Sequence, residues 1–147
     1  MRKGLIVGAI GLALSGVLVG TVLAQATDPI AARKDNRKQA GAAMKAIKGI
    51  IDAKGPAKDA VVHAAKLKEL ATAHIKLYPA GSDKGDTKAL PVIWTEWAAF
   101  EAANTASANA ADAMATAAGT GSLEALTAAF GATGKTCGAC HDKYRAK

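Results

Sequence analysis

Apolar and polar positions alternate with the period of an α-helix in four parts of the chain, and prolines, glycines or polar turns separate these parts. Asp28-Pro29 has the residues expected of a helix start, and Ser122 is a good cap for a later one. The predicted helices cover about 28–53, 57–78, 90–118 and 122–144. No stretch after the N-terminal segment has the two-residue period of a strand. The pattern therefore predicts an all-α fold, an antiparallel up-down-up-down four-helix bundle.

The N-terminal segment, residues 1–26, has the features of a secretory signal peptide. Met1-Arg2-Lys3 is cationic, residues 4–23 are uncharged and apolar, and Ala24-Gln25-Ala26 fits a cleavage site. Cleavage after Ala24 is the second option. An uncleaved anchor is the alternative, because an apolar run of about 20 residues can cross a bilayer, but the glycines and small residues favour cleavage. We therefore expect an exported domain, residues 27–147, without a membrane contact.

Composition and charge narrow the range of possible functions. The chain is 50% hydrophobic but only 4% aromatic, and alanine dominates the apolar part, so the core requires closely spaced helices or a large non-protein group. The formal net charge of +7 is spread along the sequence. Because no block of Lys and Arg is interleaved with aromatic residues, and because the chain is expected to be exported, a nucleic-acid partner is not expected.

The two cysteines lie near the end of the fourth predicted helix, in the stretch TCGACHDKYR. Cys137 and Cys140 continue a stripe of inward positions spaced alternately by three and four residues, and His141 borders it. The stripe consists of Leu123, Leu126, Phe130, Thr133, Cys137, Cys140 and Tyr144. Whatever these thiols hold is therefore held against the core.

Three kinds of chemistry fit two thiols and an imidazole. A zinc site needs four ligands, but no further cysteine exists and His63 and His74 are distant in sequence. A thioredoxin-like redox pair requires a βαβ context that this pattern lacks. C-x-x-C-H is the attachment signature of c-type haem, in which both thiols form thioethers and the histidine coordinates iron. One covalent haem c on Cys137, Cys140 and His141 is the favoured interpretation, and it would fill the alanine-rich core.

The predicted topology places the end of the fourth helix level with residues 30–40, 74–78 and 93–100. In this zone Arg33 and Arg37 occupy positions of the first helix where apolar residues belong. Arginine is rarely buried without a partner, and the haem propionates would supply one through charge-assisted hydrogen bonds. The alternative for Arg37 is a side chain that extends outward to solvent.

The chain resembles the class II cytochromes c, the cytochrome c′ group, over residues 27–147. The stretches ARKDNRKQAGAAMKAIKG, LYPAGS, IWTEWAAF and TCGACHDKYR carry the resemblance. It implies a periplasmic four-helix bundle, often a homodimer, with a C-terminal haem motif. In many members the iron is five-coordinate and high-spin and binds NO or CO. Low-spin relatives use a first-helix methionine as the sixth ligand and carry electrons.

The resemblance also assigns individual residues. It implies that Arg33 contacts the haem and that Arg145 flanks the proximal His141. Arg37 falls where relatives have Leu, Phe or, in low-spin members, Met, so the chain lacks both the apolar distal group and that sixth ligand. Trp97 belongs to an aromatic cluster expected to pack against the haem ring.

These observations predict a haem protein rather than an enzyme. We expect His141 to be the metal ligand and the opposite side of the iron to be open to NO or CO, and we expect a homodimer. The alternative is a low-spin electron carrier in which His74 is the sixth ligand. A redox enzyme is less favoured, because the predicted distal side has no acid/base pair beyond Arg37.

Overall fold

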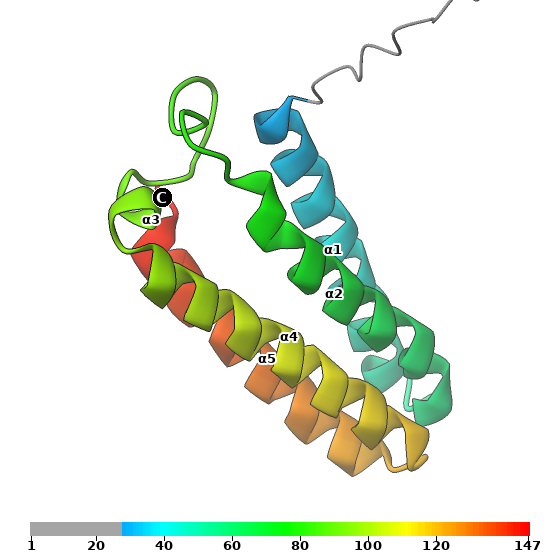
Figure 1. The fold of residues 1–147 in the computed structure, drawn as a ribbon. Helices are drawn as coiled ribbons and strands as arrows, with labels where there is room; N and C mark the ends of the chain where they lie inside the picture. The colour runs from blue at the N-terminus through cyan, green and yellow to red at the C-terminus, as the bar shows by residue number, and fades with distance from the viewer. Residues whose placement is uncertain (1–27) are drawn as a thin grey trace, which may run out of the picture.

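The computed structural model describes residues 28–147, and the predicted signal segment at 1–26 lies outside this range. Four long antiparallel helices form the bundle: α1 (Pro29–Asp52), α2 (Val61–His74), α4 (Trp97–Gly119) and α5 (Leu123–Tyr144). Figure 1 shows α1 beside α2 and α4 beside α5, and α2 also packs closely on α4. The start of α1 and the end of α5 lie at the same end of the bundle. The prediction of an all-α four-helix bundle is confirmed.

The predicted helix starts are confirmed by side-chain caps. Asp28 Oδ1 accepts a hydrogen bond from the backbone N–H of Ile30 at 2.8 Å, and Pro29 follows at the first helical position. Ser122 Oγ accepts one from the N–H of Ala125 at 3.1 Å at the start of α5. Such caps satisfy N–H groups that lack a partner within the helix.

Two of the predicted helices are interrupted. The second consists of η1 (Ala57–Ala60), α2 and η2 (Ile75–Leu77), and the third breaks at Glu96 into α3 (Val92–Thr95) and α4. Glu96 has φ −119° and ψ 44°. Ile93 is buried, and Trp94 Nε1 donates to the carbonyl of Pro79 at 3.1 Å. The prediction of a continuous third helix is therefore wrong, because the backbone at Glu96 is not helical and these contacts hold α3 separately from α4.

The apolar core has two parts. The larger lies in the half of the bundle farther from the α5 C-terminus and is rich in alanine, which allows the helices to approach closely. Its fully buried large side chains are Ile47, Met114 and Leu126, each of which stabilises the fold by about 1.5–3 kcal/mol through burial. The smaller part consists of Ile93, Phe100 and Tyr144. Side chains from both parts line a cavity between them.

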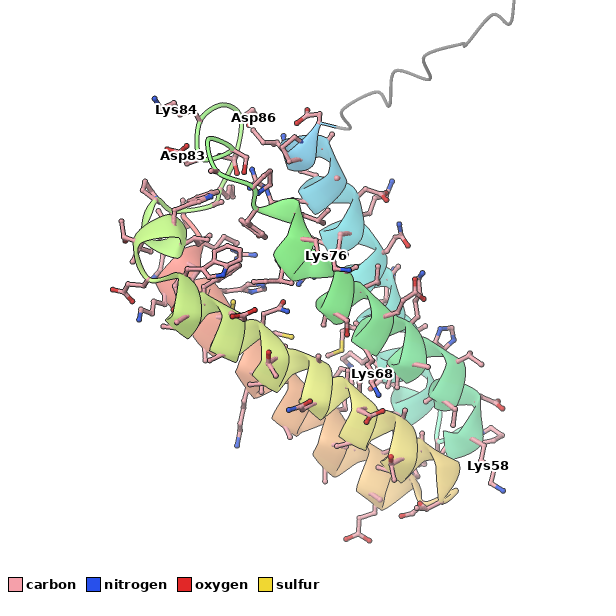
Figure 2. The ribbon with its side chains drawn as sticks, in the orientation of Figure 1. Lys58, Lys68, Lys76, Asp83, Lys84 and Asp86 are labelled. Atoms are coloured by element: carbon pink, nitrogen blue, oxygen red, sulfur yellow. The ribbon has the colours of Figure 1, made fainter. Side chains whose placement is uncertain are left out.

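The loop before α3 is fixed to the chain that follows α5. Leu90 N–H donates to the carbonyl of Tyr144 at 3.0 Å, Ala146 N–H donates to the carbonyl of Lys88 at 2.8 Å, and Ala89 forms an antiparallel bridge with Arg145. Figure 2 shows Asp83, Lys84 and Asp86 on this loop, near the start of α1. The loop therefore forms part of the cavity wall at this end of the bundle.

Within residues 28–147, no helix combines the length and the apolar character needed to cross a membrane.

Candidate functional site

All four long helices and the loop before α3 contribute to one cavity of about 590 Å³. Ligand sites in proteins commonly have volumes of about 300–1,000 Å³. Six of the seven residues predicted for the site line this cavity: Arg33, Arg37, Cys137, Cys140, His141 and Arg145. The predicted level of the site, at the end of α5 and the start of α1, agrees with this placement.

Trp97 is the predicted site residue that the structure does not bring to the cavity lining. Its side chain is 37% exposed, and its ring centroid lies 5.8 Å from that of Phe100. Trp97 is the first residue of α4 and follows directly on the break at Glu96. Phe100 takes the wall position instead, with its ring 5.1 Å from Tyr144 and 4.9 Å from Tyr78.

The wall from α5 carries two thiols and an imidazole. Cys137 and Cys140 are half-buried free thiols, and burial raises the pKa of the Cys140 thiol while the charge of Arg37 opposes that change. Burial, then the charges of Arg145 and Arg37, lower the pKa of His141. His141 is therefore held in the neutral form, which is the form that binds metals.

Arg33 is buried at the edge of the cavity, with 4% of its surface exposed. Its Nη1 donates to Ser82 Oγ at 3.1 Å and its Nη2 to the Ser82 carbonyl at 2.7 Å. The guanidinium carbon lies 4.6 Å from the centroid of the Tyr78 ring. Its Nε has no hydrogen-bond partner within the described residues. Arg33 is thus a buried cation with neutral neighbours and a free donor.

Arg37 also lines the cavity, and its side chain is exposed to solvent. Its Nε donates to Asn36 Oδ1 at 3.0 Å, and its Nη2 donates to the same oxygen. The surrounding helices desolvate the charge and lower the pKa of Arg37, an effect that Tyr78, Cys137 and Cys140 oppose. A guanidinium nevertheless keeps its proton in proteins. The cavity therefore contains a permanent positive charge opposite the cysteines.

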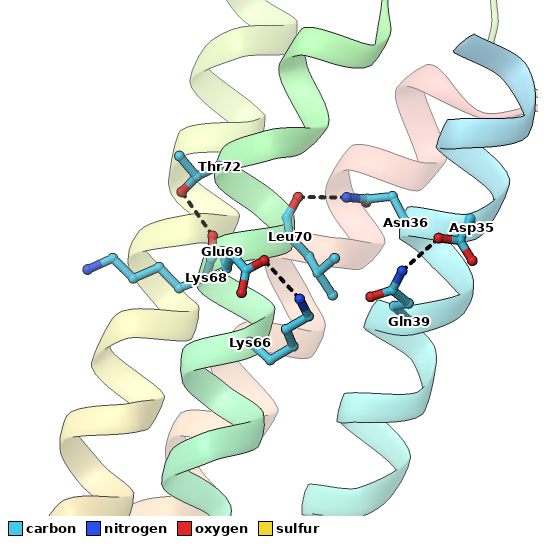
Figure 3. A network of polar contacts seen from close by, with 8 residues as sticks. All are labelled: Asp35, Asn36, Gln39, Lys66, Lys68, Glu69, Leu70 and Thr72. Carbon is cyan, nitrogen blue, oxygen red and sulfur yellow. Dashed lines mark hydrogen bonds and ion pairs between the residues drawn. The ribbon is translucent and has the colours of Figure 1, made fainter. Parts of the chain in front are cut away.

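Asn36, which the sequence reasoning missed, fixes this guanidinium. Its side chain is 6% exposed, and its Nδ2 donates to the Leu70 carbonyl on α2 at 3.0 Å (Figure 3). The amide orientation assigned by this bond leaves Oδ1 free to accept from Arg37. The sequence did contain a sign of this role. Asn36 is a polar residue about one turn after Arg33 and one turn before Ala40, on the face of α1 that packs against α2.

His74 lies in the wall formed by α2, and only 5% of its surface is exposed. Its Nε2 is 2.9 Å from Tyr78 Oη, while its Nδ1 is buried without a partner in the described residues. Burial, and then the charges of Arg37 and Arg33, lower the pKa of His74 to about 3. Burial raises the pKa of Tyr78 to about 12. Both groups are therefore neutral near pH 7.

The lining fits a flat apolar group that carries carboxylates and needs an axial nitrogen. Two thiols and a neutral imidazole share one wall. Buried Arg33 has a donor without a partner. The floor is apolar and consists of Ala40, Met44, Leu67, Ala71 and Ala111. Covalent c-type haem has all of these properties. Within residues 28–147, His, Cys, Asp and Glu side chains form no group of three or more that could hold a metal ion by themselves.

Comparisons with known proteins show similarity to one family over almost all of the described residues. The family model described as Cytochrome C' matches residues 28–145. The cytochrome c′ of Rhodopseudomonas palustris is 42% identical over 143 residues, which cover 91% of this chain and 94% of the relative.

Solved structures of the same kind share the fold. A cytochrome c′ with ligand-controlled dimer dissociation aligns with a TM-score of 0.77 and 30% identity, covering 82% of this chain and 95% of that one. The nitric oxide complex of a leucine-to-isoleucine variant from Alcaligenes xylosoxidans aligns with a TM-score of 0.72 and 27% identity, covering 81% and 94%.

Proposed function

The chain belongs to the cytochrome c′ family, and from this premise we propose that it carries one covalent haem c and binds NO or CO at an open position on the iron. The observation that carries the proposal is the placement of Cys137, Cys140 and His141 on one wall of the 590 Å³ cavity. On the α1 wall, the cationic Arg37 cannot bind iron, and the Met44 thioether lies about two turns further along α1, in the apolar floor.

The roles of the residues follow from their chemistry. The Cys137 and Cys140 thiols would hold the haem through thioethers, and the neutral His141 ring would supply the axial nitrogen. Arg33, which lines the cavity and has no carboxylate partner in the described residues, would pair with a haem propionate. Arg145, whose N–H donates to the His141 carbonyl at 3.1 Å, adds positive charge beside that ring. The bound haem would supply an iron centre that takes up diatomic ligands.

The location, assembly and class of the protein are part of the same proposal. The segment at residues 1–26 would direct the chain to the periplasm, with cleavage after Ala26 or Ala24. A homodimer is supported by the similarity to a cytochrome c′ whose dimer dissociates under the control of a ligand. We propose a ligand-binding protein rather than an enzyme.

A second candidate, a low-spin electron carrier, is favoured by one observation. His74 Nδ1 is buried without a hydrogen-bond partner in the described part of the chain, and the residue lines the cavity. An unpartnered imidazole nitrogen is a potential sixth ligand. Against this assignment, Nε2 is already engaged by Tyr78, and two arginines surround the ring.

Optical and EPR spectra of the haem-loaded protein distinguish the two candidates. We expect a high-spin ferric spectrum and a ferrous form that binds CO and NO, and we expect His74→Gln to leave the spin state unchanged. A low-spin spectrum, no CO binding and conversion to high spin in His74→Gln would contradict the open position and support the electron carrier.

A further inference from the structure

The guanidinium of Arg37 has donors that no protein group uses. An arginine side chain has five N–H donors, and the two recorded hydrogen bonds of Arg37 both go to Asn36 Oδ1. The remaining donors find no acceptor among the described residues. Because the Asn36 amide is itself fixed by the Leu70 carbonyl, the guanidinium is held in one orientation with its free N–H groups available to the cavity.

The cavity also lacks an anion to balance this charge. Its lining includes five cationic side chains, Arg33, Lys34, Arg37, Lys88 and Arg145, and one carboxylate, Asp86. Asp86 is exposed and pairs with Lys34. The other ion pairs in residues 28–147 lie elsewhere on the surface. A partly desolvated cation without a carboxylate attracts small anions, because the protein screens the charge less than bulk water does.

The position of Arg37 separates it from the other cations. Lys34, Lys88 and Arg145 are exposed, as Arg37 is, but Lys34 and Arg33 lie about one turn nearer the start of α1, and Lys88 and Arg145 lie on the loop before α3 and after the end of α5. These four can neutralise the propionates, which prefer solvent. Arg37 lies one turn deeper, followed by Ala40 and Met44. Its charge acts across the cavity on His74 and His141.

We propose that Arg37 makes the cavity a binding site for small inorganic anions, such as azide, fluoride or nitrite, on the side of the haem opposite His141. This inference rests on the proposed function, since it requires an open iron position. The anion accepts charge-assisted hydrogen bonds from the free Arg37 donors, and Asn36 is the positioning residue that aims them. Binding breaks no bond in the anion and transfers no electron. A neutral diatomic ligand gains far less from the guanidinium, so Arg37 favours anions over CO.

The test compares anion and CO affinities of the holoprotein. Azide and fluoride are titrated into the ferric form and CO into the ferrous form, with the optical spectrum as readout. We expect Arg37→Leu to raise the azide Kd about 10- to 100-fold, as for a hydrogen bond to a charged group, and to change CO affinity by less than about threefold. Asn36→Ala should weaken azide binding in the same selective way. Lys38→Leu removes the same charge from an exposed residue of α1 outside the cavity lining, and should change neither affinity.

A second measurement does not depend on the iron spectrum. Azide at a fixed concentration should raise the melting temperature of the ferric wild type, because a ligand that binds the native state stabilises it, and should raise that of Arg37→Gln by clearly less. Arg37→Lys keeps the charge without the planar donor set and should retain part of the azide affinity.

Three results would overturn the inference. The first is a wild type that binds CO but neither anion, and the second is an Arg37→Leu variant with both anion Kd values within about twofold of the wild type. In either case Arg37 does not bind anions at the iron, and the proposal of an open iron position still holds. If the wild type binds neither CO nor anions, the iron position is closed, and both the inference and the proposed function are wrong.

Discussion

His74 Nε2 and Tyr78 Oη lie 2.9 Å apart, one helical turn from each other, in the cavity wall. The Tyr78 ring packs edge-on against His74, with centroids 4.9 Å apart, and also against Phe100. On the other side of the Tyr78 ring lies the guanidinium of Arg33. His74 is therefore enclosed in an aromatic cluster beside two cations, Arg33 and Arg37, where a further positive charge is unfavourable.

The first prediction concerns acid stability. The pKa of His74 is lowered in the folded state from 6.5 to about 3, so between these values the unfolded chain binds a proton at this residue that the folded chain does not. Stability is therefore lost as the pH falls below 6.5, by up to about 1.4 kcal/mol per pH unit, until folded His74 is itself protonated. Urea unfolding of the holoprotein between pH 7 and pH 4 measures this slope.

The comparison of two histidine variants assigns the slope to His74. His74→Gln should flatten it, whereas His63→Gln, on the same helix but outside the cavity lining, controls for the loss of an imidazole. An unchanged slope in His74→Gln would show that other groups determine the acid sensitivity.

The second prediction concerns the Tyr78 hydroxyl. Tyr78→Phe keeps the aromatic packing but leaves His74 with both nitrogens unpartnered among the described groups. A buried polar group without a partner costs about 1–3 kcal/mol, so the free energy of unfolding at pH 7 should fall by that amount. If His74→Gln and Tyr78→Phe are combined, the two losses should not add, because both remove the same hydrogen bond. Full additivity in chemical denaturation would contradict the coupling.

The third prediction concerns Asn36 and its bond to α2. Asn36→Ala removes the donor to the Leu70 carbonyl and the acceptor for Arg37, and should lower the free energy of unfolding by about 1–3 kcal/mol. Gln39→Ala is the matched control on the same helix, because its amide bonds only to exposed Asp35 (Figure 3). An equal loss of unfolding free energy in the two variants would show that the buried Asn36 contacts stabilise the fold no more than the exposed Gln39 contact does.

The fourth prediction compares two glycines. Gly85 has φ +114°, and a Cβ placed there would lie 3.0 Å from Ile30 Cδ1. Gly85→Ala should therefore destabilise the fold by about 1–3 kcal/mol, as expected of a side chain forced into such a backbone conformation. Gly131 lies inside α5 with open space at its Cβ position, so Gly131→Ala should stabilise by up to about 1 kcal/mol. Thermal unfolding of both variants checks the opposite signs.

Several parts of the site could be read from the sequence alone. Helical periodicity and the cap residues predicted the bundle and its four long helices. A helix start needs a side-chain acceptor, and a buried helix face needs apolar residues at fixed intervals. The same spacing placed Cys137 and Cys140 on an inward stripe, and antiparallel topology brought them level with Arg33, Arg37 and His74. These features depend on local geometry and chain order.

Other features required the tertiary structure. Trp97 does not line the cavity, and the third helix breaks at Glu96, where Trp94 just before the break bonds to Pro79, fifteen residues away. Helical periodicity does not register such contacts.

The direction of Arg37 was likewise undecided, since a guanidinium on a helix face can reach either solvent or the interior. The sequence determined that a cation stands on α1 opposite the cysteines. Only the packing of α1 on α2, which buries Asn36 against the Leu70 carbonyl, determined that this cation is held in the cavity, because that hydrogen bond joins residues far apart in the chain.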